Sequence, residues 1–137
     1  MTDTTTAAPA LVPVPGGWII ASPARARGRF ATWAPDPNGS GDYIKHFGTP
    51  AYLAAAYGVV TYTHIVSARR ALRVVHRAML QDRYPGATIT QSRRLMGDAP
   101  RRGWWAVFPD GGSDLYLGRS LSDAVGAGLD AFNQIDL

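Results

Sequence analysis

The amino-acid sequence predicts an α+β fold, in which antiparallel sheets have helices packed on one face. Short runs of β-branched and aromatic residues alternate with strong turn sequences such as Asp36-Pro-Asn-Gly39. Helix-capping residues, among them Thr49 and Ser120, precede apolar segments. The chain has 137 residues, of which 46% are hydrophobic and 18% charged. It is therefore long and apolar enough to bury a core of its own.

The first half of the chain is expected to form three strands and a helix after a flexible N-terminal arm, residues 1–16. Thr49 and Pro50 suit the N-cap and first position of that helix, and Gly58 suits its end. The β-branched residues that follow favour a fourth strand. The predicted strands cover 18–22, 29–33, 43–47 and 59–66.

The second half is predicted to repeat this order after a basic helix. Ser67 is expected to cap a helix over 68–83, which Tyr84-Pro85-Gly86 ends. Strands are predicted over 87–93, 104–108 and 115–118, with a turn-rich loop over 96–103 that contains Arg101 and Arg102. Ser120 begins a last helix that reaches about residue 133. The pattern predicts two β-β-β-α units joined by a basic helix, as one domain over 17–137 or as sub-units 17–66 and 67–137.

The last of these units is expected to have its own small core. Alternation along the strands and helical spacing after Ser120 place five apolar side chains in one interior. These residues are Phe108, Leu115, Leu121, Val125 and Leu129.

The composition excludes several classes of catalytic and metal site. The chain has no cysteine and no glutamate, which removes disulfides, cysteine-ligated zinc and glutamate acid/base pairs. The three histidines lie on different predicted elements, so nothing in their spacing requires a metal site. The glycines Gly126 and Gly128 match a dinucleotide-binding pattern but fall inside a predicted helix rather than before one. We expect no enzymatic activity, no cofactor and no metal.

No stretch of the sequence is long and apolar enough to cross a membrane. The longest nearly apolar run, residues 51–60, is about half of the roughly 20 residues that a spanning helix needs. The N-terminus contains three prolines and lacks the basic start of a signal peptide. These features predict a cytoplasmic protein with no membrane partner.

The positive charge is concentrated in the middle of the chain. Residues 67–102 carry nine arginines against two aspartates, whereas residues 103–137 carry one arginine against five aspartates. Arginine supplies 13 of the 14 basic residues. A basic region beside an acidic end favours a polyanionic partner on one side and self-association, as a homodimer, through the other.

The predicted basic helix collects its charges on one face. Arg69, Arg70, Arg73, His76 and Arg77 fall within an arc of about 120°, opposite an apolar stripe. Like charges at i,i+4 destabilise a helix by a few tenths of a kcal/mol per pair, so stability alone does not favour this arrangement. The face suits phosphate, but a solvated arginine face and a contact with an acidic protein remain alternatives.

More arginines flank the strands after this helix, next to two tryptophans. Alternation in a strand places one of Trp104 and Trp105 outward, where its indole could stack on bases. The predicted nucleic-acid-binding residues are Arg69, Arg70, Arg73, Arg77, Arg93, Arg94, Arg101, Arg102 and Trp104.

Residues 103–132 resemble the β-hairpin and helix of HicB-type antitoxin domains. The matching positions are Phe108, Pro109, Asp110, Gly118, Ser120, Leu121, Asp123 and Ala124. The resemblance implies a partial double-stranded-RNA-binding fold and a small ribonuclease toxin as partner. A separate DNA-binding segment represses the operon in that family. Because this chain ends at Leu137, we expect no counterpart of it here.

Two functions are consistent with these patterns. The first is a small non-enzymatic nucleic-acid-associated protein, of the kind that phages and other mobile elements encode, that contacts DNA or RNA phosphate through the arginine-rich helix and loop. The second is a protein-binding inhibitor, antitoxin-like or anti-defence, that blocks a nucleic-acid-processing enzyme such as a nuclease or defence enzyme. The acidic last third of the chain and the HicB-like segment favour this second hypothesis.

Overall fold

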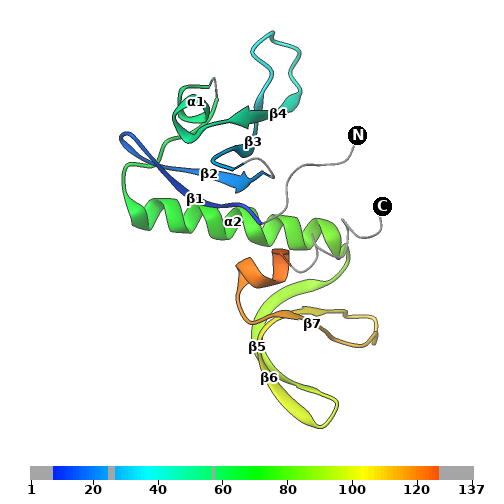
Figure 1. The fold of residues 1–137 in the computed structure, drawn as a ribbon. Coiled ribbons are helices and arrows are strands. Elements are labelled where there is room, and N and C mark those ends of the chain that lie inside the picture. The colour runs from blue at the N-terminus through cyan, green and yellow to red at the C-terminus, as the bar shows by residue number, and fades with distance from the viewer. Residues whose placement is uncertain (1–7, 25–26, 57, 127–137) are drawn as a thin grey trace. The chain divides into compact units, whose positions relative to one another are not determined.

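The computed structural model describes residues 8–24, 27–56 and 58–126, and it has the predicted α+β fold (Figure 1). Two antiparallel sheets lie in two compact units, the first ending at Leu72 and the second beginning at Arg73. The boundary falls inside one long helix. The elements are β1 (Ala10–Val14), β2 (Gly17–Pro23), β3 (Phe30–Pro35), β4 (Tyr43–Gly48), α1 (Pro50–Ala55), α2 (Ile65–Arg83), β5 (Thr88–Met96), β6 (Ala99–Val107) and β7 (Leu115–Gly118).

The first unit is a four-stranded meander in the order β1-β2-β3-β4, with α1 packed on one face. Its core is a small cluster of Val12, Ile19, Ala21 and Leu53. The predicted cap of α1 is confirmed, since the Thr49 side chain accepts a hydrogen bond from the backbone N–H of Tyr52. Local turn and cap chemistry therefore sets the β4–α1 corner, and burial of Leu53 fixes α1 on the sheet.

Two predictions for the first unit are wrong. Residues 10–14 were assigned to a flexible arm, but they form the edge strand β1, which buries Val12 against β2. An edge strand tolerates Pro13 because one side of it needs no ladder hydrogen bonds. Residues 59–66 were expected to form a strand, but the structure has only an isolated bridge between Tyr62 and Trp18 before α2 begins.

Helix α2 begins earlier than its sequence suggests. Ser67 was predicted as the cap, but the helix starts at Ile65, so Ser67 lies inside its first turn. Ala68 N–H bonds to the carbonyl of His64, which shows that the helical ladder is already formed there. The predicted end at Tyr84-Pro85 is confirmed. No helix in the described ranges is long and apolar enough to cross a membrane.

The second unit is a three-stranded meander in the order β5-β6-β7. The predicted loop over 96–103 is wrong, because β6 already begins at Ala99 and only Gly97 and Asp98 connect it to β5. Gly97 has a φ of 63°, as the first position of a tight type II′ hairpin turn requires. Beyond β7, β5 and β6 continue as a long, curved two-stranded ribbon (Figure 1). We call residues 92–103 the arginine ribbon.

Two consecutive tryptophans of β6 form the core of this unit. β6 pairs with β5 in unbroken register, so Trp104 and Trp105 lie on opposite faces of the sheet. The pairing of β6 with β7 shifts at this point, because Leu117 of β7 is an extra residue between the partners of the two tryptophans. Both tryptophans are buried, with 5% and 1% of their surface exposed. Gly103 precedes them, and a Cβ atom there would collide with the carbonyl oxygen of Gly118. Glycine at 103 therefore lets β7 approach β6 closely enough to cover Trp105.

The core of the second unit differs from the predicted one. Leu121 and Val125 are buried as expected, but Phe108 is only half-buried and Leu115 is exposed. Leu129 and the end of the predicted last helix lie outside the described residues, in which 121–126 are helical. The predicted cap is confirmed, since the Ser120 hydroxyl accepts from the Asp123 N–H. The two tryptophans supply the missing apolar volume, together with Ile89, Ala106 and Ala124.

We expect Trp105→Ala to lower the free energy of unfolding by about 3–5 kcal/mol, because it empties the largest fully buried site. Leu115→Ala should cost about 1 kcal/mol or less, because Leu115 is exposed. Urea unfolding followed by circular dichroism measures both losses. Equal losses for the two variants would contradict this core assignment.

Asp36 fixes the turn between β3 and β4 through its carboxylate. The backbone N–H of Asn38 donates to Oδ1 at 2.9 Å and the Ser40 hydroxyl donates to Oδ2 at 2.8 Å. Both hydrogen bonds favour the ionised form, so the pKa of Asp36 is lowered from its usual value of 3.8.

We expect the turn to weaken only in acid. A carboxyl whose pKa is lower in the folded state stabilises the fold above its unfolded-state pKa, and this contribution is lost as the pH falls through the lowered folded value. An NMR titration of the Asp36 carboxyl should therefore have its midpoint below 3.8. Ser40→Ala should move that midpoint up, and an unchanged midpoint would show that Ser40 does not hold the carboxylate.

Candidate nucleic-acid interface

The predicted helix arginines lie at the surface of α2. Arg69, Arg70, Arg73 and Arg77 are all exposed, the first two in the first unit and the last two in the second. His76 was expected on the same face, but it is buried with Ala68 and Leu80 on the apolar side. His76 lies near the border of the predicted basic arc, so helical spacing allows it to face either side of α2. Packing decides that it lies on the buried side. No acid precedes Asp82 on this helix, so all charged side chains exposed before that residue are positive, although Val66 and Val74 are exposed as well.

Arg77 is held in place by the second sheet. The carbon at the centre of its guanidinium lies 5.6 Å from the centroid of the Trp104 ring. Its Nη2 also donates to the carbonyl of Ile89 at 3.4 Å. This cation–π contact and hydrogen bond join α2 to β5 and β6, so Arg77 has a structural role besides its charge.

Arg83 also has a structural role that the sequence did not reveal. Its two terminal nitrogens donate to the carbonyls of Ala124 and Val125, each at 3.4 Å. These contacts connect the end of α2 to the helical residues 121–126. Because the donors and acceptors are more than 40 residues apart in sequence, no local pattern could have indicated them.

The four remaining predicted arginines meet on the arginine ribbon. Arg93 lies directly opposite Arg102, and Arg94 lies directly opposite Arg101. Residues directly opposite in an antiparallel pair share a face, and neighbouring residues alternate. One arginine pair therefore occupies each face of the ribbon. Because Arg101 and Arg102 are on a strand rather than in a loop, their spacing is fixed by the β-ladder.

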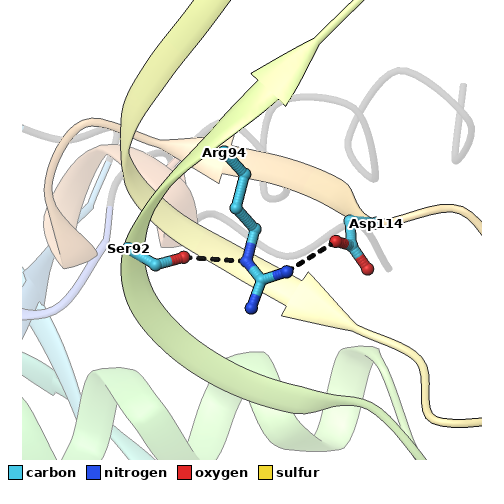
Figure 2. A network of polar contacts seen from close by, with 3 residues as sticks. All are labelled: Ser92, Arg94 and Asp114. Atoms are coloured by element: carbon cyan, nitrogen blue, oxygen red, sulfur yellow. Dashed lines mark hydrogen bonds and ion pairs between the residues drawn. The ribbon is translucent and has the colours of Figure 1, made fainter.

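One of these arginines has an acidic partner (Figure 2). Arg94 Nη1 forms an ion pair with Asp114 Oδ2 at 2.9 Å, and Arg94 Nε donates to the Ser92 hydroxyl at the same distance. The pair is partly solvent-accessible, so it contributes at most about 1 kcal/mol. Arg93, Arg101 and Arg102 are exposed and form no ion pair with a described residue.

Trp104 does not belong to the interface. It was predicted as a stacking residue, but its ring is buried beneath Arg77. Alternation does place the two consecutive tryptophans on opposite faces of β6, but the prediction assumed that one of these faces is open to solvent. Both faces are covered, since Trp104 lies beneath Arg77 of α2 and Trp105 packs against Tyr116.

Aromatic residues that the sequence analysis did not select are exposed in the first unit. Trp33, Tyr43 and Phe47 lie on β3 and β4, and Lys45 lies among them. The alternation Tyr43-Lys45-Phe47 within a predicted strand was the available signal. It was missed because aromatic residues in a strand are commonly assigned to the core.

No family model matches the chain, and neither a curated protein nor a solved structure is significantly similar to it. Within the described ranges, no three histidine or aspartate side chains gather as ligands of a metal ion would. The charge and geometry of the arginines are therefore the basis for inferring the function of this protein.

Replacing Arg102 by glutamate should stabilise the isolated protein. Like charges directly opposite in a sheet destabilise it, whereas an opposite-charge pair with Arg93 stabilises it. We expect Arg102→Glu to raise the free energy of unfolding by on the order of 1 kcal/mol at low salt.

Arg102→Gln, which only removes the repulsion, should give a smaller gain and is the matched control. Added salt should shrink both gains because it screens exposed charges. Thermal and urea unfolding measure the effect. A loss of stability on charge reversal would show that the arginines do not repel one another across the ribbon.

Proposed function

We propose that this protein is a non-enzymatic nucleic-acid-binding protein that contacts phosphate through the arginine ribbon and the exposed arginines of α2. The observation that carries the proposal is the direct opposition of Arg93 with Arg102 and of Arg94 with Arg101. This arrangement works against the stability of the free protein. A polyanionic ligand supplies the missing counter-charge.

The shape of the ribbon supports the same conclusion. A two-stranded antiparallel ribbon is one of the elements that the major groove of B-DNA admits, since that groove is about 12 Å wide. Arginines lie on both faces of the ribbon, so whichever face meets the ligand presents a pair of guanidinium groups. Each guanidinium has a planar set of donors that matches phosphate oxygens.

The charge on α2 favours the same type of ligand. Arg73 and Arg77 follow one another by one helical turn in the second unit, and Arg69 and Arg70 lie a turn before them on the continuous helix. Phosphate contacts position a protein on nucleic acid but carry no base information. Binding through these residues is therefore expected to be largely independent of sequence.

The salt dependence of binding tests the proposal. Each phosphate contact releases condensed counterions, so log affinity for duplex DNA falls with log salt with a slope of about −0.9 per contact. If Arg69, Arg73 and Arg77 of α2 contact phosphate together with Arg101 and Arg102, the slope should be about −4 to −5. The double variant Arg101→Gln/Arg102→Gln should flatten it by about 2 and weaken all sequences alike. Fluorescence anisotropy on duplex DNA and duplex RNA measures the slope.

Two further variants control for net charge. Arg119→Gln removes an exposed arginine outside the ribbon and should leave the slope nearly unchanged. Asp114→Asn removes the acidic partner of Arg94 and should strengthen binding. If the native protein binds no nucleic acid at low salt, the proposal is wrong. An acidic protein partner would then be the explanation for the ribbon, and the inhibitor hypothesis, which rests on the acidic last third of the chain, would be favoured.

A further inference from the structure

The hairpin of β3 and β4 exposes three aromatic rings and a lysine on a single face. Trp33 lies directly opposite Lys45, and Tyr43 and Phe47 lie two residues to either side of Lys45 on the same strand. Alternation along the strands therefore places all four side chains on one side of the sheet. We call this set the aromatic face. Trp33 is 61% exposed, Tyr43 65% and Phe47 47%.

This face is not the one that forms the core of the first unit. Phe30, which is half-buried, packs against the core cluster that includes Leu53 of α1. Phe30 pairs with Gly48, whereas the next residue, Ala31, pairs with Phe47. Neighbouring residues point to opposite sides, so the core side and the aromatic face are the two sides of the same hairpin.

A lysine lies close to two of these rings. Lys45 Nζ lies 5.8 Å from the centroid of the Trp33 ring and 5.6 Å from that of Phe47. Aromatic side chains left in water are unfavourable, and a contiguous group of them marks an interaction surface. A positive charge set among exposed π-faces is the combination that binds single-stranded nucleic acid, in which bases stack on rings and phosphate contacts the cation.

We propose that the aromatic face is a stacking platform for unpaired bases of single-stranded nucleic acid. This inference rests on the proposed function for its class of partner and deepens it by naming the form of nucleic acid. It assigns stacking to Trp33, Tyr43 and Phe47, and phosphate contact to Lys45.

The spacing of the rings favours unpaired bases over a duplex. Alternate residues along a strand are about 6.8 Å apart, twice the 3.4 Å separation of stacked base pairs. A duplex also presents its base faces only to neighbouring pairs, so rings cannot reach them without unstacking. An unpaired strand can open its bases to match the wider spacing.

The surrounding charges give the bound strand a path. Arg27 and Arg29, both exposed, precede β3 at the end of the hairpin where Phe47 lies. Asp36 and Asp42 lie at the other end, beside Tyr43. Phosphate is attracted at the first end and repelled at the second. The backbone is therefore expected to run from Lys45 toward Arg29.

A second copy of the chain is a poorer occupant. A two-fold dimer places the same patch on both partners. Centred on the aromatic face, such an interface would bring Lys45 close to its own copy and bury two like charges.

Binding to a strand with and without bases tests the proposal. The probes are labelled oligo(dT) of about 12 nucleotides and an abasic strand with the same number of phosphates. The native protein should prefer oligo(dT), and Trp33→Leu should weaken oligo(dT) binding by roughly 5- to 150-fold while leaving the abasic strand unaffected. Phe47→Leu should act in the same direction. Fluorescence anisotropy measures affinity, and circular dichroism confirms that each variant is folded.

Tyr52→Leu is the matched control. Tyr52 is as exposed as Trp33, at 61%, but its ring lies against Gly48 on the core side of the hairpin. Its replacement should leave the preference for oligo(dT) intact. Tryptophan emission gives a second readout, because Trp33 is exposed, Trp18 is half-buried, and Trp104 and Trp105 are buried. Oligo(dT), but not the abasic strand, should quench this emission. Trp33→Leu should abolish the response, which separates Trp33 from Trp18.

The two proposals fail in different ways. If ribbon variants flatten the salt dependence for duplex DNA but oligo(dT) and the abasic strand bind equally, the stacking platform is wrong and the ribbon stands. The opposite result is that ribbon variants leave duplex binding unchanged, while the native protein still prefers oligo(dT) and Trp33→Leu abolishes this preference. In that case the ribbon proposal is wrong and the stacking platform stands. The platform would also be wrong if Trp33→Leu abolished self-association, or binding to a poly-aspartate peptide, without changing the affinity for oligo(dT).

Discussion

The burial of Trp104 and Trp105 on opposite faces of β6 is the interaction on which the second unit depends. Because the β-sheet there has only three strands, exposure of either indole would leave the meander with little to bury. Both faces of β6 are covered at this point, and both rings are buried. Trp104 supports α2 through Arg77, and Trp105 meets the Tyr116 ring edge-on at 5.1 Å between centroids. Gly103 makes this possible by leaving room for the carbonyl of Gly118.

The same two tryptophans mark where the ribbon leaves the sheet. β7 pairs with β6 at residues 104–106, and beyond Gly103 only β5 and β6 remain paired. A two-stranded hairpin alone is marginally stable in water, so the buried tryptophans anchor a segment whose own sequence does little to stabilise it. Arginines can occupy opposed positions on the ribbon because the core, rather than the ribbon, supplies the folding free energy.

The arginines show that charge alone does not identify a binding residue. Arg77 and Arg83 bond to backbone carbonyls within the second unit, and Arg94 pairs with Asp114. Arg93, Arg101 and Arg102 are exposed and form no such ion pair in the described chain. The local sequence did not distinguish these arginines, since each lies in a basic stretch with few acids. Only tertiary contacts separate the arginines that hold the fold from those that leave their charge exposed.

The parts of the fold that local chemistry determines could be predicted from the sequence. Thr49 and Ser120 cap helices, and the strands on either side of Asp36-Pro-Asn-Gly39 form a hairpin, because turns and caps depend on a few neighbouring residues. Tertiary pairing overrode local pattern elsewhere. Pro13 suggested an arm but lies in an edge strand, and Pro100 suggested a loop but lies in β6 beyond the reach of β7. In both places one side of the strand is unpaired, which is the condition under which proline is tolerated.

The two proposed surfaces differ in their physics, and this difference distinguishes them experimentally. Phosphate contacts on the ribbon would weaken steeply with salt, since their free energy would come from released counterions. Stacking on the aromatic face would depend on apolar and π contact, so it would be much less sensitive to salt. Each surface is also unfavourable in the free protein, one through repulsion between opposed arginines and the other through exposed rings. Phosphate would relieve the first cost and unpaired bases the second, so each cost is tested by its own ligand.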